Sequence, residues 1–272
     1  MTNSSPVLSS LRRTPSALLD NPVLLVPVLI VMVFQLLQLA LRSIDPVLSS
    51  IVSIGLSLVF IAALPFFQGG LIGMADKALD GRTTLRTFVN DGTSNYVSIL
   101  VAYLALMAIN FMLGMIAFLG AILGGAVLFQ SGGLQSANTA LLAVIAVIVA
   151  SILLVYVFVI FFAQFYGQAI VLEDMGVVDG FKRSISVVRH HLVSTLGYSL
   201  FGAIFVGLAG VVFGAASILI SPQSTTMFGH LDPSLPIVVG VGLVVVVGGT
   251  LFGEFFAVYS VSFYRAITRE SK

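Results

Sequence analysis

The stretch from Gly92 to Leu172 contains 81 residues and not one charged side chain. A membrane-spanning helix needs about 20 apolar residues, so this stretch is too long for one span and long enough for two. Gln, Ser, Gly and Asn cluster between Gln130 and Asn138, which predicts the turn between the two spans. Across the whole chain 58% of the residues are hydrophobic and 8% are charged. Soluble domains carry about 25% charged residues, so the sequence predicts an all-α, polytopic membrane protein.

Further apolar runs bring the number of predicted transmembrane helices to six, in a single membrane domain that covers residues 1–272. The predicted spans are 21–41, 46–75, 96–129, 139–172, 192–220 and 237–264. The second run, at 30 residues, exceeds one perpendicular crossing, so we expect it to tilt or to extend past the membrane face.

A pair of phenylalanines recurs near the end of every second span. The pairs begin at Phe66, Phe161 and Phe255, which are 95 and 94 residues apart. A fixed period of this kind indicates repeated units. We therefore predict three hairpin repeats, at approximately 7–95, 96–191 and 192–272, each with a polar segment after its second helix and the last one truncated.

The polar segments 76–95 and 173–191 each contain apolar residues at helical spacing. An apolar stripe on an otherwise polar, basic helix is typical of a helix that lies in the headgroup region, so we predict short cytoplasmic amphipathic helices here. The stripe in the first segment comprises Leu85, Phe88 and Val89, and the stripe in the second comprises Phe181, Ile185, Val188 and Leu192.

The polar N-terminal segment, residues 7–19, leaves two alternatives open. It is either a disordered tail or a short interfacial helix that presents Val7, Leu8 and Leu11 to the membrane.

Six spans place nearly all the basic residues on one side of the membrane. Eleven of the twelve Lys and Arg side chains lie in the two termini and the two long polar segments, and Arg42 alone lies opposite. The positive-inside rule then places both termini in the cytoplasm, with the protein in the cell membrane. The formal net charge of +1 gives no reason to expect nucleic acid as a partner.

Glu254 is the only ionisable acid or base deep inside a predicted span, about 15 Å from the membrane face if the helix is regular. A charge at that depth costs roughly 2.5 to 3.5 kcal/mol, so Glu254 should face protein or water. One alternative is a neutral acid in a structural hydrogen bond to Asn110, Gln164, Tyr156 or Tyr198. The other is a proton or cation relay, or a substrate contact. The candidate intramembrane polar site comprises Glu254, Asn110, Gln164 and Gln168.

The basic side chains of the second polar segment are candidate contacts for anionic lipid headgroups. These are Lys182, Arg183, Arg189 and His190. The adjacent His190 and His191 point about 100° apart on a helix and cannot readily chelate one metal ion together. The chain contains no cysteine, phosphate loop or nucleophile elbow, so we expect no catalytic, cofactor or metal site and no enzymatic activity.

Glycines four residues apart occur in most predicted spans. Small residues at this spacing let helix backbones approach closely in lipid, which favours packing within the molecule, with a dimer face as the alternative. The pairs are Gly69 with Gly73, Gly120 with Gly124, Gly210 with Gly214, and Gly249 with Gly253.

The sequence AIVLEDMGVVDGFKRSISVVRHHLVSTLGYSL, from residue 169 to 200, carries a resemblance to a known family. With Glu173, Gly176 and the run Lys182-Arg183-Ser184, and with Arg12-Arg13-Thr14-Pro15 and Asn21-Pro22 before the first span, it resembles the membrane domain of some bacterial glycerophosphodiester phosphodiesterases. It is similar also to multi-pass membrane proteins of unassigned function common in haloarchaea. The resemblance covers most of the chain in layout. It implies a membrane architecture without the family's soluble enzymatic part.

These observations favour a membrane-embedded scaffold or accessory protein whose basic cytoplasmic helices engage anionic lipid or a partner. The partner is the lipid bilayer itself, a second copy of the chain or another membrane protein. The alternative is a small secondary transporter or proton-coupled carrier that uses the polar midplane around Glu254. The two differ in whether Glu254 opens onto a water-accessible cavity shared with Asn110 and Gln164.

The charge asymmetry predicts which positions are accessible from outside the cell. Single-cysteine variants at Gln135 and Gln223 should react with an impermeant thiol reagent on intact cells, whereas positions in 82–90 and 180–190 should not. The chain has no native cysteine, so no background labelling arises. Equal labelling of the two sets would contradict the six-span arrangement.

Overall fold

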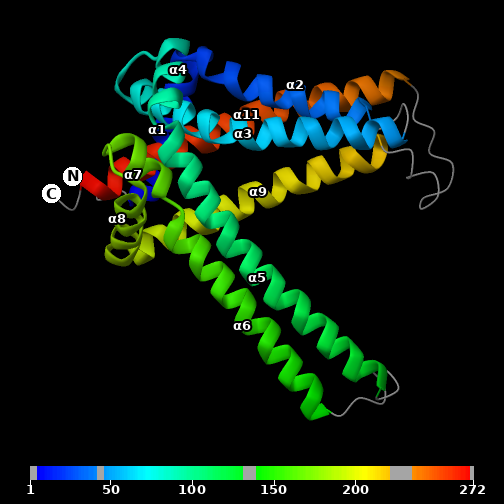
Figure 1. Ribbon diagram of the computed structural model, residues 1–272. Helices are drawn as coiled ribbons and strands as arrows, with labels where there is room; N and C mark the ends of the chain where they lie inside the picture. Colours follow the sequence, from blue (N-terminus) through cyan, green and yellow to red (C-terminus); the bar gives the residue numbers. More distant parts are fainter. Residues whose placement is uncertain (1–4, 42–45, 131–138, 221–234, 270–272) are drawn as a thin grey trace.

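The computed structural model describes residues 5–41, 46–130, 139–220 and 235–269, and every element in these ranges is a helix (Figure 1). The labelling positions Gln135 and Gln223, together with Arg42, lie outside the described residues. The elements are α1 (Pro6–Asp20), η1 (Pro22–Leu24), α2 (Leu25–Leu41), α3 (Pro46–Asp80), α4 (Leu85–Ser94), α5 (Tyr96–Gln130), α6 (Thr139–Ala163), α7 (Tyr166–Leu172), α8 (Val177–His190), α9 (Leu192–Ile220) and α11 (Leu235–Arg269).

Five stretches of the described chain are long and apolar enough to cross a membrane. A sixth is added if α1 and the following helix, which meet at an angle of 91°, are counted as one broken span. The predicted all-α membrane class is therefore confirmed. The five stretches are Val52–Asp80, Tyr96–Ala126, Leu142–Leu172, Leu192–Ala216 and Val239–Arg269.

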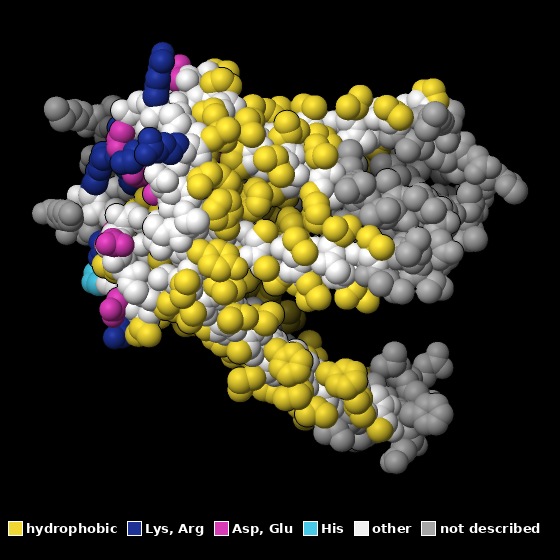
Figure 2. Space-filling view, turned by 45° about the horizontal axis from the view of Figure 1, so that its top comes forward, with side chains coloured by type: hydrophobic (Ala, Val, Ile, Leu, Met, Phe, Trp, Pro, Cys, Tyr) yellow, Lys and Arg dark blue, Asp and Glu magenta, His cyan; other side chains and the backbone are white. Residues whose placement is uncertain are grey.

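The short helices α1, α4, α7 and α8 gather at one end of the long helices, where both ends of the described chain also lie (Figure 1). Figure 2 shows Lys, Arg, Asp, Glu and His side chains at this end and hydrophobic side chains along the long helices. We call this region, formed by the four short helices and the adjoining ends of the long ones, the charged end. Within it α4 packs on α3, α8 packs on α7, and α1 packs on α11.

The corner between α1 and α2 is held by one buried side chain, Asn21. Its amide nitrogen donates hydrogen bonds to the carbonyl oxygens of Ala17, at 3.1 Å, and Gly81, at 2.9 Å. Its amide oxygen accepts from the backbone N–H of Thr83 at 2.9 Å. Gly81 has a φ of +150°, a conformation that favours glycine. Asn21 thus joins the start of the first long helix to the turn between α3 and α4.

Residues 6–20 form a helix, so the disordered-tail alternative for 7–19 is wrong. Val7 and Leu11 are partly buried against the aromatic cluster of α9 and α11, and Leu8 is 51% exposed. Two of the three apolar side chains that the sequence offers to the membrane therefore pack against protein.

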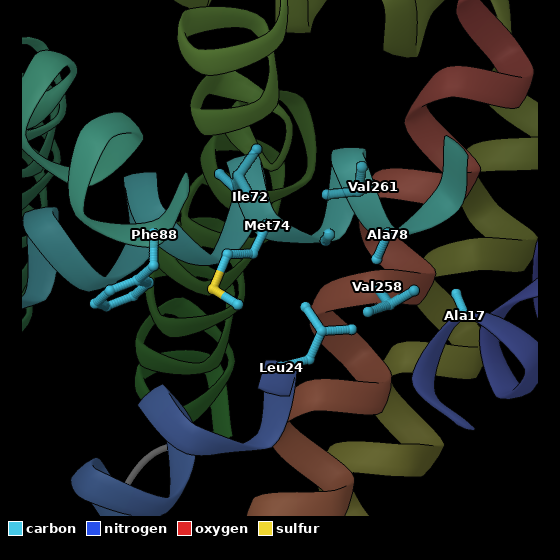
Figure 3. Packing of buried hydrophobic residues seen from close by; sticks show 9 residues of the cluster. Ala17, Leu24, Ile72, Met74, Ala78, Phe88, Val258 and Val261 are labelled. Carbon is cyan, nitrogen blue, oxygen red and sulfur yellow. The ribbon is translucent and has the colours of Figure 1, made fainter. Parts of the chain in front are cut away.

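The buried hydrophobic residues concentrate at the charged end. In Figure 3, Leu24, Met74, Phe88 and Val258 come together from η1, α3, α4 and α11. Away from this end, α5 and α6 form a hairpin that diverges from the other long helices, and we call it the α5–α6 arm (Figure 1). None of the most apolar window of the α6 span is buried, against 39% for α3. The arm therefore contacts the rest of the protein mainly at its base.

Glycines bring α3 and α4 into close contact. A Cβ atom on Gly70 would lie 2.4 Å from the Phe88 ring and 2.6 Å from the Phe88 carbonyl oxygen. A Cβ on Gly73 would lie 1.9 Å from the Asp91 carboxylate. A Cβ on Gly69 would lie 3.1 Å from the Asp91 carbonyl oxygen, so the packing predicted for Gly69 and Gly73 is confirmed.

The other glycine pairs divide between packed and open positions. Gly249 and Gly253 face α2, where a Cβ would meet Met32 at 2.5 Å and Val28 at 3.0 Å respectively. Gly124 has only an ordinary contact with Ile145, at 3.4 Å. A Cβ on Gly120, Gly210 or Gly214 would meet none of the described residues within 4 Å, so intramolecular packing is the wrong interpretation there.

Only part of the apolar stripe predicted on the second polar segment faces outward. Ile185 of α8 and Leu192 at the start of α9 are 39% and 45% exposed, as a stripe that faces the membrane requires, whereas α8 buries Val188 together with Gly180, Ser184 and Val187. The reason is close approach, because a Cβ on Gly180 would lie 2.8 Å from Ile170 of α7. Ser184 also forms two hydrogen bonds to the backbone where α6 ends and α7 begins. Its hydroxyl donates to the carbonyl of Phe162 at 2.7 Å and accepts from the N–H of Phe165 at 3.1 Å.

The contact between α3 and α4 yields a test within one helix. Gly70→Ala places a methyl group inside the van der Waals radius of Phe88, so we expect the free energy of unfolding to fall by about 1 to 3 kcal/mol. Gly55→Ala, in the same helix, meets nothing within 4 Å and should gain up to about 1 kcal/mol from helix propensity. Thermal unfolding of both variants in detergent gives the comparison, and equal melting temperatures would contradict it.

Candidate functional site

Glu254 lies in α11 with its carboxyl group fully buried. Neither carboxyl oxygen has a hydrogen-bond partner in the described part of the chain. The expected structural hydrogen bond to Asn110, Gln164, Tyr156 or Tyr198 is therefore wrong for these residues. Asn110 lies on the α5–α6 arm, exposed, and its amide donates to the carbonyl of Leu106 one turn earlier. The structure does not bring Glu254 and Asn110 together.

Gln164 and Gln168, the other two predicted site residues, line a cavity of about 750 Å³ at the base of the arm. Its walls come from α2, α3, α5, α6, α7, α9 and α11. Neither Glu254 nor Asn110 contributes to the lining. The predicted polar site therefore divides into a buried carboxyl group and a separate cavity.

Hydrogen bonds between neutral side chains connect the polar lining residues. Ser260 of α11 accepts from the Gln168 amide of α7 and from the Tyr198 hydroxyl of α9, each at 2.8 Å. Ser199 of α9 donates to the Gln164 amide oxygen at 3.1 Å. The cavity therefore sits where three parts of the chain distant in sequence are joined by uncharged groups.

A further hydrogen bond joins two polar residues of the lining. The Tyr166 hydroxyl donates to the amide oxygen of Gln68 at 3.0 Å. The roles of Tyr166, Ser199 and Ser260 were missed from sequence, where the available signal was their polarity within predicted apolar spans.

Two partly buried ion-pair groups tie the elements of the charged end together. Arg183 of α8 donates through Nε to both Glu173 carboxylate oxygens, at 3.2 and 2.9 Å, and Tyr264 of α11 donates its hydroxyl to the same carboxylate. Arg265 of α11 pairs with Asp76 and Asp80 of α3, at 3.1 and 2.7 Å. These groups fix α8 and α3 to α11.

The four predicted headgroup contacts differ in their exposure and in the bonds that they already make within the protein. Arg183 is paired with Glu173 and its side chain is 28% exposed. Lys182 is 73% exposed and lies 3.6 Å from Asp179 on the same helix. Arg189 and His190 are exposed, and the His190 ring bonds only the carbonyl of Ser186. Contact with lipid stays a prediction for all four. Arg189 and His190 are exposed, and Lys182 is exposed although it pairs with Asp179, so these three side chains can reach a headgroup.

Metal-ligating side chains do not converge within the ranges that the structure describes. No three His, Cys, Asp or Glu side chains lie close enough together there to hold an ion. The arrangement offers neutral hydrogen-bonding groups around a cavity and charged groups at one end.

The profile of a family described as a domain of unknown function, DUF7847, matches residues 6–267. The chain belongs to this family. The match begins at the first residue of α1 and ends two residues before the end of α11, so the family layout includes the cavity and nearly all of the charged end. No curated protein and no solved structure matches the chain. The resemblance to the membrane domain of glycerophosphodiester phosphodiesterases stays a prediction.

The surroundings of Glu254 predict an unusual response to an apolar substitution. Glu254→Leu breaks no hydrogen bond and removes a buried unsatisfied group, whose burial costs about 1 to 3 kcal/mol, so we expect a higher melting temperature in detergent. Gln168→Leu breaks the bond to Ser260 and should lower the free energy of unfolding by about 1 to 2 kcal/mol. Similar destabilisation by both variants would show that Glu254 has a partner.

Proposed function

We propose that this protein is a multi-pass cell-membrane protein that acts as a scaffold or accessory factor through its charged end. The proposal rests on a difference among the basic side chains at this end: some are partly buried in ion pairs, and others are exposed. Arg183 and Arg265 are bound to acidic partners within the protein, whereas Lys182 and Arg189 reach the surface. The ion pairs of Arg183 and Arg265 hold the helices of the charged end together. The exposed cations are available for anionic lipid headgroups or an acidic partner.

Exposed apolar side chains lie on the same short helices as the exposed cations. Leu19 in α1, Val89 in α4 and Val178 in α8 are 83%, 49% and 65% exposed. Each of these helices also carries an exposed Arg or Lys. A basic helix with an exposed apolar side is suited to the boundary between headgroups and acyl chains. This combination supports contact with the membrane surface.

The proposed topology has six spans, with α2 as the first and α1 lying across its end. The charges at one end and the sharp corner at Asn21 support it. We infer that this end is cytoplasmic, because basic residues favour that side.

A repeat of three units is part of this proposal. Helix α4 packs on α3, and α8 packs on α7, as a hairpin followed by a short helix would require. The third unit ends with α11, and the helix that packs on its charged end is α1. The first helix of the chain would then complete the last repeat.

The carrier alternative requires a titrating group that faces an accessible cavity. Glu254 does not line the cavity of about 750 Å³, and the lining of that cavity holds no charged side chain. The scaffold role therefore has the better support.

Lipid retention tests the role of the exposed cations. The protein is purified from vesicles that contain equal amounts of zwitterionic and anionic lipid, and the ratio of the lipids that remain bound is measured. Lys182→Gln with Arg189→Gln should lower the anionic fraction, because each basic residue near the surface contributes about 1 kcal/mol.

Arg183→Gln is the matched control. Its charge is paired with Glu173, so the variant should lose thermal stability and keep the lipid ratio of the unaltered protein. An unchanged ratio in the Lys182 and Arg189 variant would count against the proposed lipid contact.

A further inference from the structure

The cavity at the base of the α5–α6 arm has the chemistry of a ligand site. Its volume of about 750 Å³ lies within the roughly 300 to 1,000 Å³ of small-molecule sites. Apolar side chains form most of the wall, and no Lys, Arg, His, Asp or Glu contributes to it. A ligand with a formal charge would lose its hydration there and gain no counter-charge. The lining therefore favours an uncharged molecule.

The polar part of the lining lies on the side nearest the charged end. In α9, Tyr198 and Ser199 are closer to that end than Gly202, and in α11 Ser260 is closer than Gly253. The same order holds where α6 leads into α7, since Gln164 follows Val157 toward the charged end. The cavity is thus polar toward the membrane surface and apolar toward the membrane interior, which is the orientation of a lipid in one leaflet.

Two hydrogen-bond donors at the polar side have no protein acceptor. Within the described ranges, no hydrogen bond is made by the amide nitrogen of Gln68 or by the hydroxyl of Tyr103, and both residues line the cavity. A Cβ on Gly167 would lie 2.7 Å from that amide nitrogen, so the absence of a side chain there gives the amide its place. Donors without acceptors suit a ligand with ester, ether or hydroxyl oxygens.

The cavity has a lateral route from the bilayer. Residues of α6 and α9 both contribute to its wall, yet within the described ranges these two helices do not pack extensively against each other. In Figure 2 a notch separates the α5–α6 arm from the rest of the protein. An acyl chain can therefore enter from the side without leaving the hydrocarbon.

We propose that this cavity binds one lipid with an uncharged, oxygen-bearing head, of the diacylglycerol class. Gln68 and Tyr103 donate to its head oxygens, and its chain lies along Val157, Ile160 and Phe161 of α6. This site is separate from the headgroup contacts at the charged end, because it selects against charge. A helix from a second copy would fill the apolar part and leave both donors unsatisfied.

Photo-crosslinking of the full chain in detergent tests the site. The probe is a diacylglycerol with a diazirine in one acyl chain, and the comparison probe is a phosphatidylglycerol with the same chain. Peptide mapping should find the diacylglycerol adduct on residues 157–161, and excess unlabelled diacylglycerol should remove it. The phosphatidylglycerol probe should label these residues at least tenfold less.

Two matched pairs of variants locate the contacts. Gln68→Leu should reduce labelling about tenfold, the effect of one hydrogen bond, whereas Gln35→Leu changes an exposed glutamine of α2 and should have no effect. Gly202→Leu projects into the cavity beside Phe256 and should abolish labelling. Gly207→Leu, in the same helix with nothing within 4 Å, should leave labelling intact.

Three results would overturn the proposal. Equal labelling by both probes would remove the selection against charge. Labelling spread along the exposed face of α6 and insensitive to competitor would indicate bulk lipid contact. A crosslink from residues 157–161 to a second copy would indicate a protein occupant. If Gly202→Leu fails to fold, two measurements still test the proposal. They are competition with unlabelled diacylglycerol on the unaltered protein and the comparison of Gln68→Leu with Gln35→Leu.

Discussion

Apolar helices gain little by packing against one another in lipid, because the acyl chains they displace are equally apolar. This constraint accounts for where the protein is held together. The buried clusters lie at the charged end, where side chains pack between the short helices and the long ones. Glycine contacts and ion pairs act at the same end, through Gly70 against Phe88 and Arg265 against Asp76. Farther along the helices fewer contacts hold them, and the α5–α6 arm is free to diverge.

The divergence of the arm and the rigidity of the charged end together create the cavity. Hydrogen bonds between uncharged groups, through Ser260, hold α7, α9 and α11 together at its polar side. With increasing distance from the charged end, α6 diverges from α9 (Figure 1). A bundle packed uniformly along its length would leave no such space. Glu254 lies outside this arrangement, since its carboxyl group faces protein and no partner. The polar groups that line the cavity are therefore uncharged, and the one carboxyl group buried nearby in α11 has no hydrogen-bond partner among the described residues.

Hydropathy was sufficient to predict the helical membrane class, the long helices and the short helix after α3. It could not predict which side of each long helix faces protein, because these helices are apolar all round and carry no periodic signal. Asn110 and Gln164 illustrate the difficulty, since both are amides within apolar runs, yet one is exposed and the other lines the cavity. The stripe predicted on α8 was only partly correct, because small side chains such as Gly180 decide which face approaches α7, and Val188 is buried as a result. Asn21 acts through a partner some sixty residues away, which no local pattern reveals.

The contact between α1 and α11 joins the first helix of the chain to the last. Helix α1 is synthesised before α11 and before all the helices between them. The surface of α11 on which α1 packs is therefore absent until α11 has been made. An amphipathic helix with Leu8 and Leu19 exposed can bind the membrane surface until then. The docking of α1 must therefore follow the synthesis of α11, because a chain truncated before α11 would leave α1 without this contact.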